Sequence, residues 1–544
     1  MTTTRGDGSN LEGARARPEV AVPGGRREEA AAGGAIGGWV TTLRRPSTRR
    51  YIGWTIVVVV PSLLLRLWAI DALGVNSDEA VYAGQAASLA RDPAFLPFFP
   101  VFRAHPLLFQ SVVSIGYQFG WGDWWGRFAS VLFGLATVLL VFELGRHLYG
   151  TRAGLIAASI LALMPYHVAV TRQVLLDGPQ TFFLTLTLYL LARYGTSRGR
   201  VWLYAAGAAL GLSVLSKEPA ILFCGGVYAF FALAPQVGIK VRHFLGAAAL
   251  MAIAIVPFPL AIALSGRPKS GGNFLAWQLF RRPNHSLLFY PTVVPVAIGI
   301  GVVLAAIAAL VLTRRRRMWT WRETLLVCWI VVPAAFFELW PVKGFQYLLP
   351  VAPAVAVLAA RLFTLELPRR RNPGFLRRVP APAAQAAVLA VLLATLAWPT
   401  AAITQPSERA TFLAGSGGVP GGREMGAWIQ TNVPEGATML AIGPSMANIV
   451  EFYGHRRAYG LSVSSNPLRR NPSYEPVGNP NRRISQSDIQ YLVWDSYSAS
   501  RTKFFARQLA TYASTFHGRA VYTYTVRSGG VAVPVIRIYE VRPK

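Results

Sequence analysis

The sequence predicts a polytopic α-helical membrane protein that ends in a water-soluble α/β domain. Of its 544 residues, 53% are hydrophobic and only 14% are charged, which is too apolar for a soluble protein of this size. About eleven hydrophobic runs are long enough to cross a bilayer core of ~30 Å. The last run ends near Ala402, and the composition beyond it is that of a soluble domain.

The chain divides into three parts by composition. Residues 1–50 are rich in Gly, Ala, Arg and Glu without apolar periodicity, which predicts a disordered cytoplasmic tail. This tail lacks the apolar core and cleavage site of a signal peptide, so we expect the first span to stay in the mature protein. Residues 51–402 form the predicted membrane domain, and residues 403–544 the predicted α/β domain outside the membrane.

The predicted spans are residues 52–70, 128–148, 153–170, 181–193, 201–216, 219–234, 244–264, 290–312, 324–340, 347–363 and 384–402. With the N-terminus inside, the basic clusters Arg314 to Arg317 and Arg369 to Arg371 both fall on the cytoplasmic side, as the positive-inside rule requires. This places the C-terminus outside. Because the net charge of +30 is spread over such short loops, we expect no nucleic-acid partner.

The first outer loop, residues 71–123, contains two predicted surface helices, at 79–91 and 106–119. The apolar positions of the first helix predict a face that lies along the membrane surface. The C-terminal part alternates predicted helices at 424–431, 449–453 and 501–512 with predicted strands at 437–442, 489–494, 520–526 and 533–541. A loop occupies 467–483, and the alternation indicates an α/β domain.

The adjacent carboxylates of Asp78 and Glu79 are the strongest candidate for a functional site. They follow the first span directly, where desolvation opposes charge and a fold gains nothing from an acidic pair. The alternative is that Asp78 only caps the helix that follows it. Arg103 and His105 lie in the same loop, and they favour a binding site.

Other ionisable residues fall in the remaining outer loops. Asp177 precedes Gly178-Pro179 and is either functional or a helix cap. Lys217 and Glu218 interrupt an apolar hairpin, as a site or as a local ion pair. Arg281 and Lys343 are basic residues predicted outside the membrane, and Lys343 lies close to Tyr347. A bound anion would explain why basic residues occur there. Arg66 either reaches the membrane surface harmlessly or joins that anion site.

Carboxylates and cations at one face of a membrane suit an enzyme that activates a hydroxyl and releases a phosphate. A carboxylate removes the proton of the hydroxyl, and cations or a metal ion neutralise the leaving phosphate. Asp78 and Glu79 are candidate ligands for Mg or Mn, although two carboxylates do not make a site by themselves. The sequence contains no nucleotide-binding glycine loop, so a cytosolic nucleotide sugar is not the expected donor.

Several short motifs together resemble the GT-C glycosyltransferases, in particular the protein O-mannosyltransferases and lipid A aminoarabinose transferases. The motifs are Asp78-Glu79-Ala80-Val81-Tyr82-Ala83, His105-Pro106-Leu107, Arg127-Phe128-Ala129-Ser130, Asp177-Gly178-Pro179 and Lys343-Gly344-Phe345-Gln346-Tyr347. The resemblance implies a GT-C membrane domain, a polyprenyl-phosphate sugar donor, Asp78 as the base, Asp177 in support, and inversion by direct displacement. It assigns no single donor-phosphate contact among the basic residues.

The expected activity is the transfer of a mannose- or arabinose-type sugar to a hydroxyl of a cell-envelope glycan, lipid or protein, outside the cytoplasmic membrane. The soluble domain departs from the eukaryotic mannosyltransferases, so the resemblance does not imply a protein acceptor. Two other classes remain open: a transporter or flippase of lipid-linked sugars, which often shows inverted repeats, and a non-catalytic envelope-assembly protein.

Overall fold

The computed structural model describes residues 46–102, 105–265, 277–278, 281, 283–365, 381–406 and 419–543. The chain separates into one unit of Met1–Trp54 and a second of Thr55–Lys544. The ion pairs, hydrogen bonds and cavities around the candidate site residues lie within the second unit. The predicted tail up to residue 45 and the candidate Arg103 lie outside the described residues, whereas residues 46–50 already belong to helix α2.

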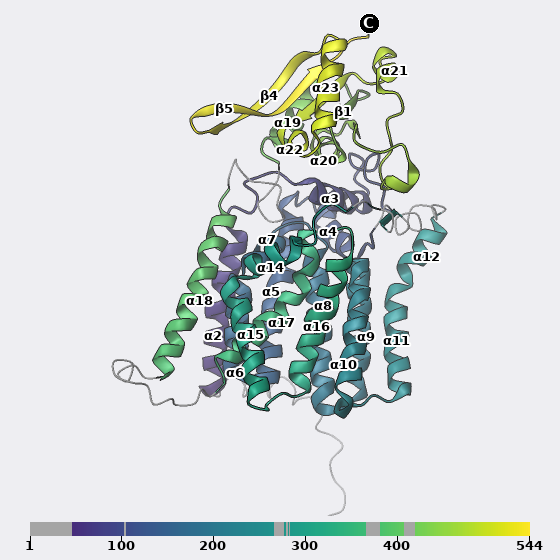
Figure 1. Ribbon diagram of the computed structural model, residues 1–544. Coiled ribbons are helices and arrows are strands. Elements are labelled where there is room, and N and C mark those ends of the chain that lie inside the picture. Colours follow the sequence, from purple (N-terminus) through teal and green to yellow (C-terminus); the bar gives the residue numbers. More distant parts are fainter. Residues whose placement is uncertain are drawn as a thin grey trace, which may run out of the picture. The chain divides into compact units, whose positions relative to one another are not determined.

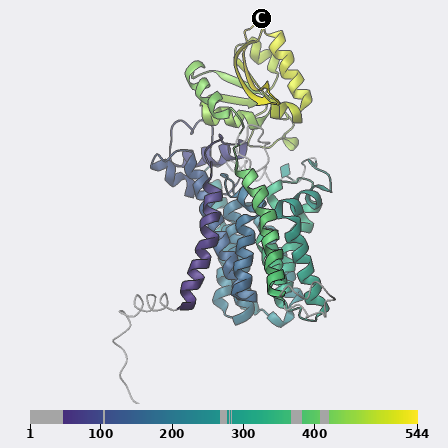
Figure 2. The same ribbon diagram turned by 90° about the vertical axis from the view of Figure 1, so that its left-hand side faces the viewer.

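Helices of 8 to 26 residues form the membrane domain, and Figures 1 and 2 show many of them side by side. Their bounds are α2 Pro46–Leu67, α5 Trp124–Tyr149, α6 Thr151–Leu163, α8 Asp177–Ser197, α9 Arg200–Ser216, α10 Phe223–Leu233, α11 Val241–Ile255, α12 Pro257–Leu264, α14 Phe289–Ile298, α15 Ile300–Arg315, α16 Trp321–Leu339, α17 Ala352–Leu362 and α18 Ala381–Thr404.

Four helical stretches among the described residues are long and apolar enough to cross a membrane: Trp124–Tyr149, Val241–Leu264, Phe345–Leu362 and Ala383–Thr404. A fifth results if α14 and α15, which are bent by 95°, count as one span. Four shorter apolar helices occupy further predicted spans, at Thr55–Leu67, Thr151–Leu163, Arg200–Ser216 and Glu218–Leu233. The count of about eleven spans and the orientation therefore stay predictions.

Two predicted spans are interrupted by a residue with non-helical backbone angles, and each break has a local cause. The run 153–170 divides into α6 and the short helix α7 (Pro165–Val170), because Pro165 has no N–H to continue α6 and suits the start of a new helix. The run 290–312 bends at Gly299, whose φ of 101° is open to glycine but strained for other residues.

The two helices of the first outer loop are confirmed as α3 (Ser77–Leu89) and α4 (Leu108–Gln118). The prediction that the apolar face of α3 lies along the membrane surface is wrong. Ala83, Ala86 and Ala87 are at most 1% exposed, because α3 packs against α4 and against α20 of the C-terminal domain.

The C-terminal domain contains one sheet of order β2-β1-β3-β5-β4, which confirms its α/β character. The strands β1 (Thr438–Ala441), β2 (Arg457–Gly460) and β3 (Tyr491–Asp495) are parallel, and the hairpin β4–β5 (Arg519–Ser528, Val531–Glu540) pairs antiparallel to β3. The helices are α19 Gly422–Asn432, α20 Pro444–Ile449, α21 Pro480–Ser485, α22 Ser496–Arg501 and α23 Lys503–Thr515. Strand β2 was not predicted, since Arg-Ala-Tyr-Gly shows no apolar alternation.

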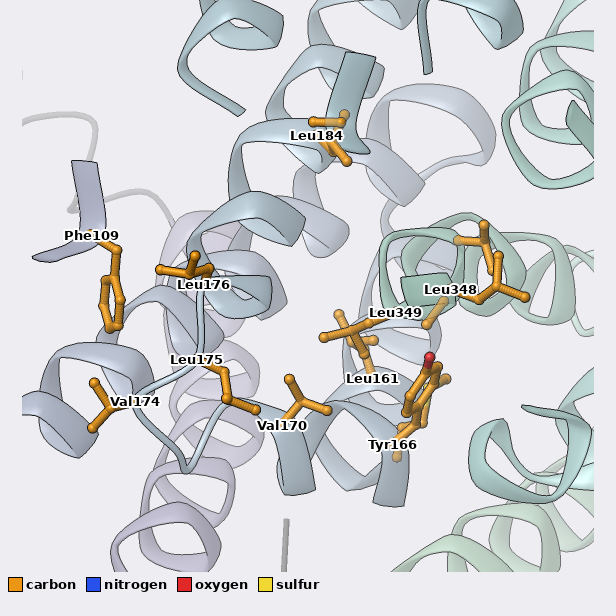
Figure 3. Close-up of a cluster of buried hydrophobic side chains, with 14 of the residues drawn as sticks. Phe109, Leu161, Tyr166, Val170, Val174, Leu175, Leu176, Leu184, Leu348 and Leu349 are labelled. Carbon is orange, nitrogen blue, oxygen red and sulfur yellow. The ribbon is translucent and has the colours of Figure 1, made fainter. Parts of the chain in front are cut away.

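A buried apolar cluster supports the end of the membrane domain that carries the ionisable residues. It combines Leu175 and Leu176, which precede Asp177, with Leu348 and Leu349 of the short helix η3 (Phe345–Val351) and with Tyr166 of α7 (Figure 3). The hydroxyl of Tyr166 donates to the Phe345 carbonyl. The cluster therefore fixes the loop before Asp177 relative to the turn that carries Gln346 and Tyr347.

Candidate active site

Two cavities meet at Asp78. The first, of about 420 Å³, is lined from the helical domain by Asp78, Tyr82, His105, Lys217, Trp277, Gln278, Arg281, Gln346 and Tyr347, and we call it the Lys217 cavity. The second, of about 450 Å³, is lined by Asp78, Gln346, Lys343, His285, Phe289 and others, and we call it the Lys343 cavity. Asp78 and Gln346 line both. Six of the predicted site residues thus face one of two adjoining spaces.

The side chain of Asp78 faces the cavities because another residue caps its helix. Asn76 is the N-cap of α3, and its Oδ1 accepts hydrogen bonds from the backbone N–H groups of Asp78 and Glu79, each at 3.0 Å. The reading of Asp78 as a helix cap is therefore wrong. Its side chain is exposed, at a helix N-terminus where the dipole favours a carboxylate.

The environment of Asp78 holds its pKa above the usual value of a carboxyl group. The main cause is desolvation in a deep pocket, in which water reaches the carboxylate but protein surrounds it. The charge of Lys217 opposes this shift, and that of Asp177 adds to it. A carboxylate with a raised pKa is a better proton acceptor than an ordinary surface carboxylate.

Glu79 points away from the cavities and binds Arg127 of α5. Its two carboxylate oxygens accept hydrogen bonds from the guanidinium at 2.8 and 2.9 Å, and they also accept from the backbone N–H groups of Val174 and Asn76. Both side chains are buried. Neither a catalytic role for Glu79 nor metal ligation beside Asp78 finds support in this arrangement, because both oxygens are occupied.

Asp177 and Lys217 form a second buried ion pair behind the Lys217 cavity. The ammonium of Lys217 lies 2.8 Å from each carboxylate oxygen of Asp177 and 5.0 Å from the ring centre of Tyr347. Burial opposes the charge of Lys217, but Asp177 outweighs it and raises the pKa of the ammonium. Asp177 makes no cap hydrogen bond in α8, so the alternative that it is a helix cap is wrong. Glu218 binds His105 at 2.8 Å instead of Lys217, so the alternative of a local ion pair between Lys217 and Glu218 is also wrong.

The remaining basic candidates differ in how accessible they are. Arg281 lines the Lys217 cavity, with its guanidinium 4.5 Å from the ring centre of Trp277. The ammonium of Lys343 is directed to the carbonyls of Phe337 and Glu338 at the end of α16, so its contact with a donor phosphate stays a prediction.

Arg66 reaches neither water nor the cavities. It is fully buried and binds Ser62, His167 and Thr171. The prediction that it reaches the membrane surface and the alternative that it joins the anion site are therefore both wrong.

The described residues contain no group of three or more His, Cys, Asp or Glu side chains that could hold a metal ion. Mg or Mn ligation by Asp78 and Glu79 together would require Glu79 to leave Arg127.

Several cavity residues were not predicted from the sequence. Tyr82 lines the Lys217 cavity and lies four residues after Asp78, and this spacing on one helix face was the signal that could have identified it. Tyr497 and Arg501 of the C-terminal domain line the Lys343 cavity. They are more than 400 residues from Asp78 in the sequence, and no local pattern indicates their position.

Solved structures of known proteins share this architecture. The apo crystal structure of ArnT from Cupriavidus metallidurans superimposes with a TM-score of 0.65 at 16% identity, over 90% of this chain and 98% of ArnT. The chain has the GT-C fold. The Archaeoglobus fulgidus oligosaccharyltransferase tethered to an acceptor peptide also matches, with a TM-score of 0.56 at 14% identity over 91% of this chain and 74% of that protein.

Sequence comparisons agree with the fold. Residues 104–260 match the family of dolichyl-phosphate-mannose-protein mannosyltransferases. An undecaprenyl phosphate-α-4-amino-4-deoxy-L-arabinose arabinosyl transferase of Sodalis glossinidius is 30% identical over 276 residues, which are 47% of this chain and 48% of that protein. An uncharacterized protein of Aquifex aeolicus is 31% identical over 205 residues, which are 35% of this chain and 40% of the relative.

The matches cover less than half the length of these curated relatives. The resemblance to GT-C glycosyltransferases that the motifs predicted is confirmed.

Proposed function

We propose that this protein is a GT-C glycosyltransferase that moves a sugar from a polyprenyl-phosphate donor to a hydroxyl group, with Asp78 as the base. The observation that carries the proposal is the position of Asp78: an accessible carboxylate with a raised pKa at the junction of two cavities, one of them lined by Lys217 and Arg281. A base between two binding spaces suits a reaction that joins two substrates.

The Lys217 cavity is the proposed place of the donor phosphate. The ammonium of Lys217 has three N–H donors, and two of them bind Asp177, which leaves one for a phosphate oxygen. Arg281 supplies a second cation and Tyr347 a phenol at the same cavity. These groups would stabilise the negative charge that develops on the departing phosphate.

The proposed reaction is a direct displacement at the anomeric carbon. Asp78 takes the proton of the acceptor hydroxyl as its oxygen attacks the sugar. The bond between the anomeric carbon and the phosphate oxygen breaks, and the polyprenyl phosphate leaves with the electron pair. One base and no covalent sugar–enzyme intermediate are required, so the sugar is transferred with inversion.

Similar proteins support a lipid-phosphate donor. ArnT of Cupriavidus metallidurans has been crystallised with undecaprenyl phosphate, and this chain matches that structure with a TM-score of 0.62 at 16% identity. The Sodalis glossinidius relative is named as an undecaprenyl phosphate-α-4-amino-4-deoxy-L-arabinose arabinosyl transferase, and a Bacillus subtilis relative, 28% identical over 174 residues, as a putative mannosyltransferase. Mannose- and arabinose-type donors are therefore the first to test.

The direct test is transfer by the purified full-length protein. Polyprenyl-phosphate mannose, 4-amino-4-deoxyarabinose, arabinose, glucose and galactose, each labelled in the sugar, are incubated with the protein in membranes that supply glycan, lipid and protein acceptors. Parallel reactions contain Mg, Mn or a chelator. We expect label to leave one lipid donor and appear in an acceptor fraction. If label remains on all donors under every metal condition, the proposal is overturned.

The same assay separates an enzyme from a flippase of lipid-linked sugars. A flippase would move the labelled lipid between leaflets without breaking the sugar–phosphate bond, whereas the proposed enzyme releases free polyprenyl phosphate. A binding protein of envelope assembly would do neither.

We further propose that the N-terminus lies in the cytoplasm and that Asp78 and the C-terminal domain lie outside the membrane. The basic clusters predict this orientation through the positive-inside rule. A phosphatase that is active only outside the cytoplasm, fused after Lys544, should be active. Activity of a cytoplasm-specific reporter at the same position would contradict the orientation.

A further inference from the structure

The parallel strands of the C-terminal domain end at the two cavities. β1 is followed by Pro444 and β2 by Ser462 to Ser464, all of which line the Lys217 cavity. β3 is followed by Tyr497 and Arg501, which line the Lys343 cavity. In open α/β sheets, ligands bind beyond the carboxyl ends of parallel strands. The edge of the sheet that is suited to ligand binding therefore faces Asp78.

Direct contacts hold the helical connection between β1 and β2 beside the turn that carries Asp78. The backbone N–H of Val75 donates to the Tyr453 hydroxyl at 2.8 Å, and the amide of Asn448 donates to the Ser77 hydroxyl at 3.0 Å. Ser77 and Asn448 are both buried. Because Val75 and Ser77 lie just before Asp78, the C-terminal domain and the proposed base are positioned together.

The edge differs in chemistry from the helical side of the cavities. Its cavity-lining residues include the hydroxyls of Ser462 and Ser464, two tyrosines, and the guanidinium groups of Arg469, Arg470 and Arg501. It contributes no carboxylate to either cavity. Among the described residues, none of the three arginines forms an ion pair.

Hydroxyls, aromatic rings and arginines together suit a polar ligand that carries negative charge. Tyrosine offers an apolar ring face and a hydrogen-bonding tip, and arginine binds carboxylate or phosphate groups through two parallel N–H donors. The donor phosphate is already provided for by Lys217 and Arg281 on the helical side. Arg501 lines the other cavity, apart from Lys217 and Arg281, so it is placed to bind a different anionic group.

We propose that the edge formed by the carboxyl ends of β1, β2 and β3 is the acceptor site, and that the acceptor is a saccharide bearing anionic groups. The inference rests on the proposed function and adds a substrate class to it. A hydroxyl of the bound saccharide reaches Asp78 from this edge, while the donor occupies the helical side. The proton and electron-pair transfers are those of the displacement described above.

A polypeptide acceptor fits this edge less well. Extended peptides bind most readily as an additional strand alongside an outer strand of a sheet. Of the two outer strands, β4 contributes no residue to either cavity. The other, β2, has only four residues, and its Ala458 N–H already donates to the Glu451 carboxylate at 3.3 Å. Strand addition at β2 is therefore obstructed.

The test measures binding of matched tetrasaccharides to the full-length protein in detergent. Hyaluronan and oligogalacturonate tetrasaccharides carry carboxylates, and the chitin tetrasaccharide is neutral. We expect at least one anionic tetrasaccharide to bind about tenfold more tightly than the neutral one, which is the scale of one charge-assisted hydrogen bond. The variants Arg470→Gln and Arg501→Gln should each lose most of this difference.

The matched control is Arg507→Gln, which changes an exposed arginine of α23 that lines neither cavity; its binding should equal that of the wild type. Binding of undecaprenyl phosphate to Arg501→Gln should also be unchanged. If neither anionic tetrasaccharide binds more tightly than the neutral one, or if Arg507→Gln has the same effect as Arg501→Gln, the proposal is overturned. Specific binding of a serine-rich peptide with loss of affinity in Arg501→Gln would instead favour a protein acceptor and also overturn it.

These outcomes are distinct from a failure of the proposed function. A protein that binds undecaprenyl phosphate and cleaves a lipid donor, but discriminates between no tetrasaccharides, contradicts only the acceptor site. A protein that cleaves no donor contradicts the proposed function itself.

Discussion

The carboxylate of Glu79 and the guanidinium of Arg127 form a buried ion pair with two hydrogen bonds, of 2.8 and 2.9 Å, between α3 and α5. Arg127 also donates to the carbonyls of Ile70, Leu73 and Gly74. The pair thus ties the turn before Asp78 to the helical domain. Glu79 and Arg127 influence Asp78 by fixing its position, and neither lines the Lys217 cavity or the Lys343 cavity.

Removal of either partner should destabilise the protein strongly. Arg127→Ala or Glu79→Gln leaves a buried group without its partner, which costs about 3–5 kcal/mol, and we expect a clear fall in the thermal unfolding temperature. The control is Glu143→Gln, which removes an exposed ion pair with Arg146 on the same α5 and should cost less than about 1 kcal/mol. Equal unfolding temperatures of Arg127→Ala and Glu143→Gln would refute the positioning role.

The charge of Asp177 should move the acid limit of activity to higher pH, in addition to the larger effect of desolvation on the pKa of Asp78. Asp177 raises the pKa of Asp78, and Lys217 lowers it. Asp177→Asn removes the repulsion and leaves the ammonium free to act on Asp78, so the pKa of Asp78 falls. Because the base must be ionised, the acid limb of the pH profile of kcat/KM should move to lower pH. A limb that stays in place, or moves to higher pH, would argue against Asp78 as the base.

Arg281 should contribute to binding of the leaving lipid phosphate. A hydrogen bond between a guanidinium and a phosphate contributes about 2 kcal/mol, so Arg281→Gln should weaken binding of undecaprenyl phosphate about thirtyfold. Arg242→Gln, on an exposed position of α11, is the matched control and should bind like the wild type. If the two variants bind equally well, the phosphate lies elsewhere.

The C-terminal domain should lose stability as pH rises. Desolvation raises the pKa of Asp495 to about 6, whereas an unfolded aspartate has a pKa of about 3.9. Below about pH 4 the group is protonated in both states. As pH rises through about 6, ionisation favours the unfolded chain by roughly 3 kcal/mol.

The variant Asp495→Asn should remove this dependence, since asparagine keeps the oxygen that accepts from the Ser498 N–H. Unfolding temperatures of the wild type and the variant, measured from pH 4 to 8, should therefore approach or cross as pH rises. Asp488→Asn, at a half-exposed position, should retain the slope of the wild type. Parallel curves for the wild type and Asp495→Asn would contradict the pKa assigned to this carboxyl.

The sequence predicted the features that depend on local pattern. Asp78 was predicted as a site residue because a carboxylate beside an apolar run can be recognised within a short stretch of sequence. The α/β character of the C-terminal part followed from alternating strands and helices, although β2 was too short and too polar to be recognised.

Partners set by tertiary packing could not be predicted. Lys217 lies 40 residues from Asp177, and the two meet because α8 and α9 pack together. The roles of Glu79 and Arg127, and the approach of Arg501 to the site, likewise depend on contacts between distant segments. Local periodicity carries no information about such contacts.

The central claim is that Asp78 accepts the proton of the acceptor while a lipid phosphate leaves. It is tested most directly by measuring sugar transfer and undecaprenyl phosphate binding together, in the wild type and in Asp78→Asn. We predict that Asp78→Asn lowers transfer by about 10²–10⁴-fold, the range for loss of a general base, and leaves the unfolding temperature and lipid-phosphate binding close to those of the wild type. Transfer by Asp78→Asn at the wild-type rate would contradict the account.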